Sequence, residues 1–289
     1  MKISEIFEQK KTVFSFEVFP PKKTSSIDSI YSKLGALSEC KPDFISVTYG
    51  AGGGGASVLT ADICKAIQEQ YNIPSMMHLT CVNSSKESVE EVLKLIKEYG
   101  IENILALRGD IVPDLPRQTD FMHANELVTY IKERGDFHIS GACYPEGHPE
   151  SDNMIDDILN LKRKVDAGAK HLVSQLFFDN NMFYEFQEKA RLAGINVPIE
   201  AGIMPVVNKA QIERMVTTCG ASLPAKFVKM MNRFEHSPEA LRDAGIAYAI
   251  DQVVDLMSQG VDGVHLYTMN QPEVAKKISD AVASLRSCQ

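Results

Sequence analysis

The chain has 289 residues, of which 44% are hydrophobic, and this supplies enough apolar material for one large core. Its formal net charge of -8 gives no electrostatic support to a nucleic-acid partner. No apolar run approaches the ~18 residues that a membrane span needs, and the amino terminus lacks a signal-peptide segment, so we expect a cytoplasmic protein without membrane contact.

Strands and helical segments alternate along the chain. Residues 1–11 predict a short amphipathic helix ahead of the first strand. Several of the strands that follow are apolar over nearly their whole length, as expected for parallel strands that are buried on both faces. We predict strands at Val13–Phe19, Phe44–Tyr49, Ser75–Cys81, Ile104–Leu107, His138–Tyr144, His171–Phe178, Ile199–Pro205 and Gly263–Tyr267.

The segments between these strands have helical periodicity. Within residues 88–100, one helical stripe carries Val89, Val92, Leu93 and Ile96, and Gly100 marks its end. The gap at residues 208–262 is long enough for more than one helix. We therefore predict one α/β domain over residues 1–289, a (β/α)8 TIM barrel with a short N-terminal helix and an extra helix before the last strand. An open doubly wound sheet is the alternative.

Cysteine and histidine spacing gives no sign of a metal site. Six cysteines are scattered without a CxxC pair, which argues against structural zinc, an iron–sulfur cluster and a disulfide framework, and fits a reducing compartment. The potential ligands His78, Glu146, His148 and His265 show no HxH or HExxH spacing. We predict no metal.

Polar residues collect where the predicted strands end. In a β/α barrel this edge carries the active site. The residues are Glu17, Thr48, Tyr49, His78, Arg108, Gly109, Asp110, Tyr144, His148, Gln175 and Tyr267 to Asn270, with Glu17, His78 and Gln175 inside their strands. A barrel with a purely structural role would gain nothing from this arrangement, so we predict an active site at the barrel mouth.

Two carboxylates among these residues are candidates for catalysis. Glu17 lies between Phe16 and Phe19, where desolvation would favour its neutral form and suit it to general-acid work. The alternative is a core-edge glutamate paired with an arginine such as Arg108. Asp110 ends the sequence LALRGD at the mouth, where a carboxylate can steer a ligand or stabilise a developing cation. A surface turn would look identical.

The helix predicted after the fifth strand carries a second candidate site. Asp157, Asn160 and Lys164 follow at i, i+3 and i+7 and share one face, with Arg163 beside them. Such a face can bind ribose hydroxyls and a pyrophosphate, although a solvated charged face has the same pattern. The glycine-rich residues 51–55 could let a ligand approach the backbone, or form a surface loop.

The motifs SFEVFPPK, SVTYGAGG, HLTC, ALRGD, YPEGHPE, LKRKVDAGA, QLFFD, GIMPV and HLYTMN, in this order and spacing, resemble the bacterial methylenetetrahydrofolate reductases over almost the whole chain. The resemblance implies a flavin-dependent β/α barrel that reduces 5,10-methylenetetrahydrofolate to 5-methyltetrahydrofolate. It also implies bound FAD, NADH or NADPH as the electron donor, and a ping-pong cycle.

Site roles follow from the same resemblance, position by position. It implies that Glu17 is the general acid and that Asp110 lies near flavin and pterin, with Gln175, Gln211 and Gln271 as folate contacts. Gln175 would also serve the nicotinamide. The implied cofactor-binding set is Thr48, Tyr49, Ala51, His78, Arg108, Gly109, Asp110, Ala124, Tyr144, His148, Ser151, Asp157, Asn160, Arg163 and Lys164.

The chain departs from the family pattern at three places. Met215 stands where some relatives have an aromatic residue, Gln271 stands where some have an arginine, and the loop after the second strand is unusually glycine-rich. Two alternative functions therefore stay open. One is a flavin-bearing subunit of a folate-linked electron-transfer complex that needs a protein partner as donor, and the other is a barrel that binds its ligands without turnover. Family members also often form homo-oligomers.

Overall fold

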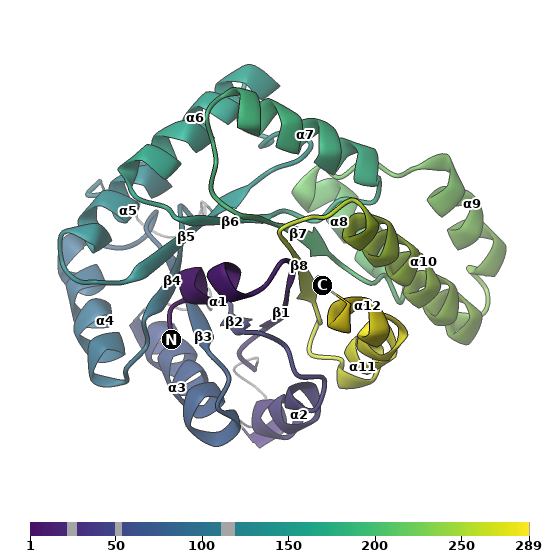
Figure 1. The fold of residues 1–289 in the computed structure, drawn as a ribbon, viewed down its shortest axis with the longest axis horizontal. Coiled ribbons are helices and arrows are strands. Elements are labelled where there is room, and N and C mark those ends of the chain that lie inside the picture. Colours follow the sequence, from purple (N-terminus) through teal and green to yellow (C-terminus); the bar gives the residue numbers. More distant parts are fainter. Residues whose placement is uncertain (22–27, 50–53, 111–118, 289) are drawn as a thin grey trace.

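The computed structural model describes residues 1–21, 28–49, 54–110 and 119–288. Eight parallel strands close into a barrel in chain order, and helices surround them (Figure 1). The strands are β1 Val13–Val18, β2 Ile45–Val47, β3 Ser75–Thr80, β4 Asn103–Leu107, β5 His138–Cys143, β6 His171–Ser174, β7 Ile199–Ile203 and β8 Gly263–Tyr267. The predicted barrel is confirmed, and the open-sheet alternative is wrong.

The helices follow the strands in the expected alternation. They are α1 Ile3–Gln9, α2 Asp28–Ser38, α3 Gly54–Tyr71, α4 Lys86–Glu98, α5 Ala124–Lys132, α6 Met154–Ala167, α7 Asn180–Leu192, α8 Lys209–Cys219, α9 Ala225–Phe234, α10 Pro238–Ser258, α11 Pro272–Ala281 and α12 Ala283–Ser287. Three of them, α8 to α10, fill the long gap before β8, as predicted. Across the described ranges, no helix is long and apolar enough to cross a membrane.

Helix α4 shows how the apolar stripes build the core. Its four predicted stripe residues are all buried against the barrel, and each contributes about 1.5–3 kcal/mol by leaving water. The Ser85 side chain accepts a hydrogen bond from the Ser88 backbone N–H at 3.2 Å and so caps the first turn. Gly100 follows the last turn with φ +66°, a conformation that favours glycine.

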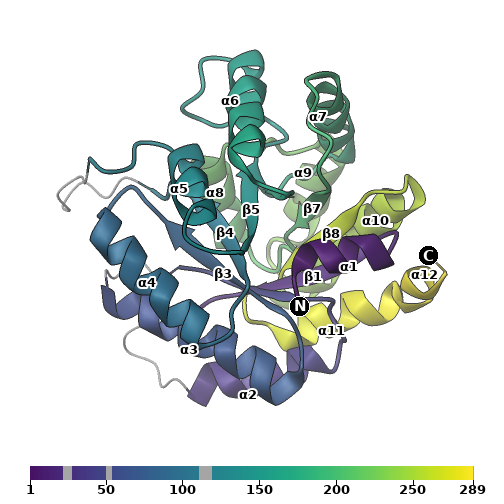
Figure 2. The ribbon, with the colours of Figure 1, turned by 60° about the vertical axis from the view of Figure 1, so that its left-hand side comes forward.

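Helix α1 covers the amino-terminal end of the barrel. Ile3 and Ile6 are buried there against Val13, Phe44 and residues from β3, β4 and β6, and the Ile3 backbone N–H donates to the Asn103 side chain at 2.9 Å. In Figure 1 this helix lies over the middle of the ring of strands, and Figure 2 shows both chain termini on the same side of the molecule. The opposite end is left for the site.

Strand β6 ends earlier than predicted. Its last residue is Ser174, not Phe178, so Gln175 lies just beyond the strand instead of within it. The reason is a side chain from β8: the Tyr267 hydroxyl donates to the Ser174 carbonyl at 2.6 Å. In addition, the Ser174 hydroxyl accepts from the Gly202 N–H at 2.8 Å. These bonds replace the next rung of the ladder between β6 and β7.

Candidate active site

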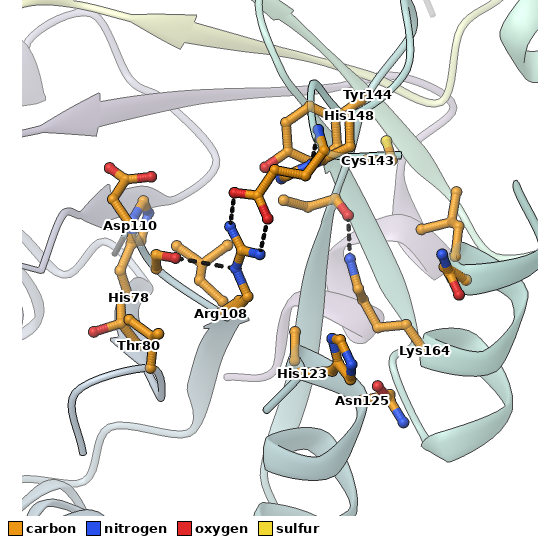
Figure 3. A pocket seen from close by; sticks show the side chains of 18 of the residues that line it. His78, Thr80, Arg108, Asp110, His123, Asn125, Cys143, Tyr144, His148 and Lys164 are labelled. Carbon is orange, nitrogen blue, oxygen red and sulfur yellow. Dashed lines mark hydrogen bonds and ion pairs between the residues drawn. The ribbon is translucent and has the colours of Figure 1, made fainter. Parts of the chain in front are cut away.

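A cavity of about 880 Å³ lies at the carboxyl ends of β3, β4 and β5, bordered by the start of α5 and one face of α6 (Figure 3). Most of the predicted cofactor-binding set converges there. The lining includes Thr48, Tyr49, His78, Arg108, Gly109, Asp110, Ala124, Tyr144, His148, Ser151, Asp157, Asn160, Arg163 and Lys164. Ala51 lies outside the described residues.

The sequence Arg108-Gly109-Asp110 turns the chain sharply at the end of β4. Gly109 has φ +84°, and a Cβ built on it would lie only 2.9 Å from Thr80 Cβ. The turn therefore needs glycine on two counts, conformation and space. It leaves Asp110 exposed at the cavity wall. The position expected for Asp110 at the mouth is confirmed.

Arg108 reaches across the mouth to the loop after β5. Its two terminal nitrogens hold the Glu150 carboxylate at 2.5 and 2.7 Å, a bidentate ion pair visible in Figure 3. The hydrogen bond to Glu150 raises the pKa of the Arg108 guanidinium. The alternative in which Arg108 pairs with Glu17 is therefore wrong, because the partner of Arg108 is Glu150.

Lys164 projects from α6 into the cavity along the face of β5. Its ammonium group donates to the Ala142 carbonyl at 2.6 Å, and burial lowers its pKa. The side chain passes directly over Gly141, where a Cβ would lie 2.6 Å from Lys164 Cδ. A glycine at this position of β5 is therefore what lets the lysine reach the cavity.

The other polar residues of α6 stand beside Lys164, as the i, i+3, i+7 spacing predicted. Asp157 is buried and accepts a hydrogen bond from the Ser151 hydroxyl at 2.9 Å. The Arg163 guanidinium donates to the Asn160 side chain at 2.6 Å. All three residues line the cavity, Asp157 in a buried position and Asn160 and Arg163 at its solvent-exposed rim.

Tyr144 and His148 form an aromatic edge of the cavity. Their rings meet edge-on with centroids 4.6 Å apart. His148 Nδ1 accepts the Glu150 backbone N–H at 3.1 Å, which places the ring proton on Nε2. Burial raises the pKa of Tyr144 to about 12 and lowers the pKa of His148. Both rings are therefore neutral near pH 7.

Glu17 lies inside the barrel, next to the cavity residue His78. The Glu17 carboxylate is 3.6 Å from His78 Nε2 and 3.8 Å from His265 Nε2, and it is 7% exposed. Burial lowers the pKa of His78 to about 4, an effect that outweighs the attraction of Glu17. At neutral pH the imidazole is therefore uncharged, and its contact with Glu17 is not an ion pair.

The three predicted folate contacts lie outside this cavity, around the ends of β6, β7 and β8. Gln175 Oε1 accepts the Leu176 N–H at 2.9 Å, and Gln211 Oε1 accepts the Val207 N–H at 3.1 Å. Gln271 is the first residue before α11. Met215 packs into an apolar cluster with Leu176, Phe178, Met204 and Met269 close to these glutamines.

Several cavity residues were not predicted from the sequence. Asn83 and Ser84 follow β3, His123 and Asn125 begin α5, and Glu150 closes the ion pair with Arg108. The polar run Asn83 to Ser85 directly after a strand was a usable signal. Glu146 from the same loop bonds elsewhere, accepting the Ser222 N–H at 3.0 Å. Within the described ranges, no group of His, Cys, Asp and Glu side chains is arranged to hold a metal ion.

The residues present fit an elongated dinucleotide. Besides Arg108, the cavity offers two cations, Arg163 and Lys164, beside the polar groups of Asp157 and Asn160, and such a set suits phosphates and sugar hydroxyls. Farther along, His78 presents a buried Nε2 that has no hydrogen-bond partner within the described part of the chain. Buried polar atoms of this kind are normally satisfied by a ligand or water.

The closed barrel, with its polar cavity at the carboxyl ends of the strands, defines an enzyme of the β/α-barrel class. The family model for methylenetetrahydrofolate reductase matches residues 2–283. The 5,10-methylenetetrahydrofolate reductases of Pectobacterium carotovorum and Escherichia coli are 39% and 37% identical, each over 91% of this chain and 88% of the relative. The chain therefore belongs to the methylenetetrahydrofolate reductase family, and the predicted resemblance is confirmed.

Two further likenesses extend this comparison. Methylenetetrahydrofolate reductase (NADH) 1 of Arabidopsis thaliana is 37% identical over 93% of this chain, which spans about half of that longer protein (48%). A solved structure of an uncharacterized protein from Clostridium thermocellum, described as binding two copies of 5-methyl-5,6,7,8-tetrahydrofolic acid, covers the whole chain with a TM-score of 0.68 and 12% identity. At that identity the likeness shows the fold alone.

Proposed function

We propose that the chain reduces 5,10-methylenetetrahydrofolate to 5-methyltetrahydrofolate with bound FAD, in a ping-pong cycle with NADH as electron donor. The observation that carries the proposal is the pairing of a buried carboxyl group, Glu17, with an adjoining cavity suited to a dinucleotide. Family membership supplies the folate chemistry. When bound, FAD takes up a hydride from the donor and releases it to the folate.

In this proposal the cofactor-binding residues divide by chemistry. Arg163 and Lys164 counter the phosphate charge, while Asp157 and Asn160 bind sugar hydroxyls. Tyr49, Tyr144 and His148 supply neutral ring surfaces. Thr48, His78 and the Arg108–Asp110 turn face the reacting ring system, where Asp110 stabilises positive charge that develops on the folate.

Glu17 acts on the folate in this proposal. Its carboxyl group donates a proton to the amine nitrogen that leaves the methylene bridge, so that the C–N bond breaks and a reactive iminium remains. The Glu17 side chain is buried beside neutral His78. Gln175 and Gln211 hold the folate, and Gln271 contacts its glutamate tail. Gln175 then serves the nicotinamide in the other half of the cycle.

A steady-state experiment tests the whole cycle. The FAD-loaded protein is supplied with NADH and 5,10-methylenetetrahydrofolate, and 5-methyltetrahydrofolate is quantified while both concentrations are varied. Parallel double-reciprocal lines support a ping-pong cycle at one shared site, whereas intersecting lines contradict it. Folate-dependent flavin chemistry without any NADH oxidation would instead favour the subunit that depends on a partner protein. The single-domain organisation, the cytoplasmic location and homo-oligomer formation stay predictions.

A further inference from the structure

A second buried carboxylate lies deeper in the barrel than Glu17. Glu200 on β7 and His171 on β6 are both fully buried, with Glu200 Oε2 3.1 Å from His171 Nε2. Neither atom has a hydrogen-bond partner within the described residues, and Glu200 Oε2 also lies 3.9 Å from His265 Nδ1. Burying such a pair in an apolar core is costly, and the roles described above for the active site do not account for it.

The barrel is shaped to hold this pair. A Cβ on Gly263 of β8 would lie 2.7 Å from Glu200 Cγ, so the glycine leaves the space that the Glu200 side chain occupies. The Phe7 ring of α1 packs against His171 with ring centroids 4.8 Å apart. Phe44 lies 6.2 Å from the same imidazole. These aromatic rings separate the pair from solvent at the floor of the barrel.

A line of polar atoms connects the pair to the active-site acid. Glu200 Oε1 accepts a hydrogen bond from the Ser15 hydroxyl at 2.7 Å. The same hydroxyl lies 2.6 Å from His265 Nδ1. On its other side, His265 Nε2 is 3.2 Å from the Ser46 hydroxyl and 3.8 Å from Glu17 Oε2. A side-chain shift of under about 1 Å that exchanges Ser46 for Glu17 brings Nε2 within hydrogen-bond distance of the carboxylate.

Burial and the surrounding charges favour a proton on Glu200 beside a neutral His171. Burial raises the pKa of Glu200 to about 7, assisted by Asp43 and Asp262 and opposed by His265 and Ser15. Burial lowers the pKa of His171 to about 3. Asp43 is itself paired with Lys10, and Asp262 with Arg191 at 3.0 Å. His138, which is buried next to His171, is also neutral at pH 7.

We propose that Glu200 and His171 store a proton in the barrel core and resupply Glu17 with it through Ser15 and His265 while a bound folate separates Glu17 from solvent. This inference rests on the proposed function. Glu200 and His171 are positioning residues that set the protonation of Glu17, which is the group that meets the substrate. When the cavity is open, solvent refills the store along the same line in reverse.

The transfer conserves every proton. The Ser15 hydroxyl first rotates from Glu200 Oε1 toward His265 Nδ1. The Glu200 carboxyl proton then moves to Ser15 Oγ, the Ser15 hydroxyl proton moves to His265 Nδ1, and the Nε2 proton of His265 moves to Glu17. Each O–H or N–H bond that breaks is replaced by another. The net change is one proton from Glu200 to Glu17, and the Glu200 carboxylate that remains faces His171 Nε2.

Glu200→Gln tests the store, with His138→Gln as the matched control because His138 is a buried polar residue of the same core that lies off the line. The FAD enzyme is kept reduced with excess chemical reductant and supplied with 5,10-methylenetetrahydrofolate, and repeated folate-driven oxidation is followed from pH 5 to 9, because Glu17 needs resupply only after it has given up its own proton. We expect the parent and His138→Gln rates to fall above about pH 7. Glu200→Gln should be about 10-fold slower at pH 6 and should lack that inflection.

The outcomes separate the two proposals. No folate-driven oxidation in the parent would overturn the proposed function itself. Normal oxidation in the parent, together with a Glu200→Gln profile that has the parent's inflection and rate within about twofold, would overturn only the proton store. An equal loss in Glu200→Gln and His138→Gln would also overturn the store, since it would reflect general damage to the core.

Infrared spectroscopy of the parent protein tests the proton store without turnover and without depending on the folding of a variant. Infrared difference spectra of the parent without added cofactor, recorded between pH 5 and 9, should show the carbonyl band of a buried carboxylic acid that disappears near pH 7. The band should be absent in Glu200→Gln and shifted in His171→Gln. A parent spectrum without such a band would contradict the inference.

Discussion

The two halves of the barrel mouth are built differently. Around the ends of β3 to β5, polar side chains converge on one cavity. Around the ends of β6 to β8, glutamine side chains accept hydrogen bonds from nearby backbone N–H groups, Gln175 from Leu176 and Gln211 from Val207. An apolar cluster that includes Met204 and Met215 backs them. In the first half the polar side chains already face the cavity. In the second half they must break their local hydrogen bonds before they can form hydrogen bonds to a ligand.

This difference fits an enzyme that keeps one ligand and exchanges others. A cofactor that stays bound gains affinity from a preformed site, because little is spent on ordering it. Ligands that alternate gain from side chains that can return to local partners when the site empties. We therefore propose that FAD binds in the β3–β5 half and the folate and nicotinamide bind in the β6–β8 half, with Glu17 between them.

The largest effect is expected at Glu17. Glu17→Gln keeps the shape but removes the acid, and we predict a loss of about 10²- to 10⁴-fold in folate reduction with FAD reduction by NADH largely unchanged. Stopped-flow absorbance of each half-reaction measures this. Glu146→Gln, a glutamate bonded to the Ser222 backbone, is the control. Equal loss in both half-reactions would contradict the assignment of Glu17 to the folate.

Lys164→Met should weaken FAD binding by about 10- to 100-fold, as expected for losing a charge-assisted hydrogen bond. Lys162→Met is the matched control, since Lys162 pairs with Asp166 on the exposed side of the same helix. Fluorescence titration of the flavin gives both dissociation constants. If the two variants bind FAD equally well, the α6 face is not the phosphate site.

Gln211→Ala should raise the KM for the folate by about 10-fold, the cost of one lost hydrogen bond, and leave the FAD dissociation constant within about twofold. The KM for the folate and the FAD dissociation constant together test whether the two halves of the mouth bind different ligands. Weaker FAD binding in Gln211→Ala would show that they are not.

The pH dependence of stability tests whether the titratable side chains inside the barrel are desolvated. Burial lowers the pKa values of His78 to about 4 and of His138 and His171 to about 3. Between pH 6.5 and these values the unfolded chain binds protons that the folded chain does not, so the free energy of unfolding falls as the pH drops. Glu200, with a raised pKa, acts oppositely and destabilises the fold as pH rises from 4.5 toward 7.

Thermal unfolding measured at intervals from pH 4 to 8 checks these signs. His138→Gln should flatten the loss of stability on the acid side, and Glu200→Gln should flatten the loss toward pH 7. Each unit of pKa difference between folded and unfolded states corresponds to about 1.4 kcal/mol. A parent melting temperature that stays constant between pH 6.5 and 4 would contradict the buried, neutral histidines.

The smallest effect is expected at the ion pair that crosses the first half of the mouth. Glu150→Gln removes one partner of Arg108, yet the Glu150 side chain is 56% exposed. Solvent screens such a pair, so we expect a change in unfolding free energy of less than about 1 kcal/mol. Chemical denaturation of the variant and the parent provides the comparison, and a loss of several kcal/mol would show that the pair holds the loop in place.

Periodicity was sufficient to predict the strands, the stripe of α4 and the convergence of α6 residues on one cavity, because each depends on local spacing. The end of β6 was predicted wrongly because it depends on the Tyr267 hydroxyl, which comes from 93 residues away. The pairings of Arg108 with Glu150 and of Glu200 with His171 likewise depend on register around the closed barrel. No local sequence pattern carries that information.

Above all, we propose that this chain transfers reducing equivalents between a flavin and a folate. The most direct test is anaerobic: the purified protein is loaded with FAD, 5-methyltetrahydrofolate is added, and flavin absorbance is followed without any other donor. We expect bleaching of the flavin in the parent and bleaching that is slower by about 10²-fold or more in Glu17→Gln. An unchanged spectrum in the parent, with FAD demonstrably bound, would contradict it.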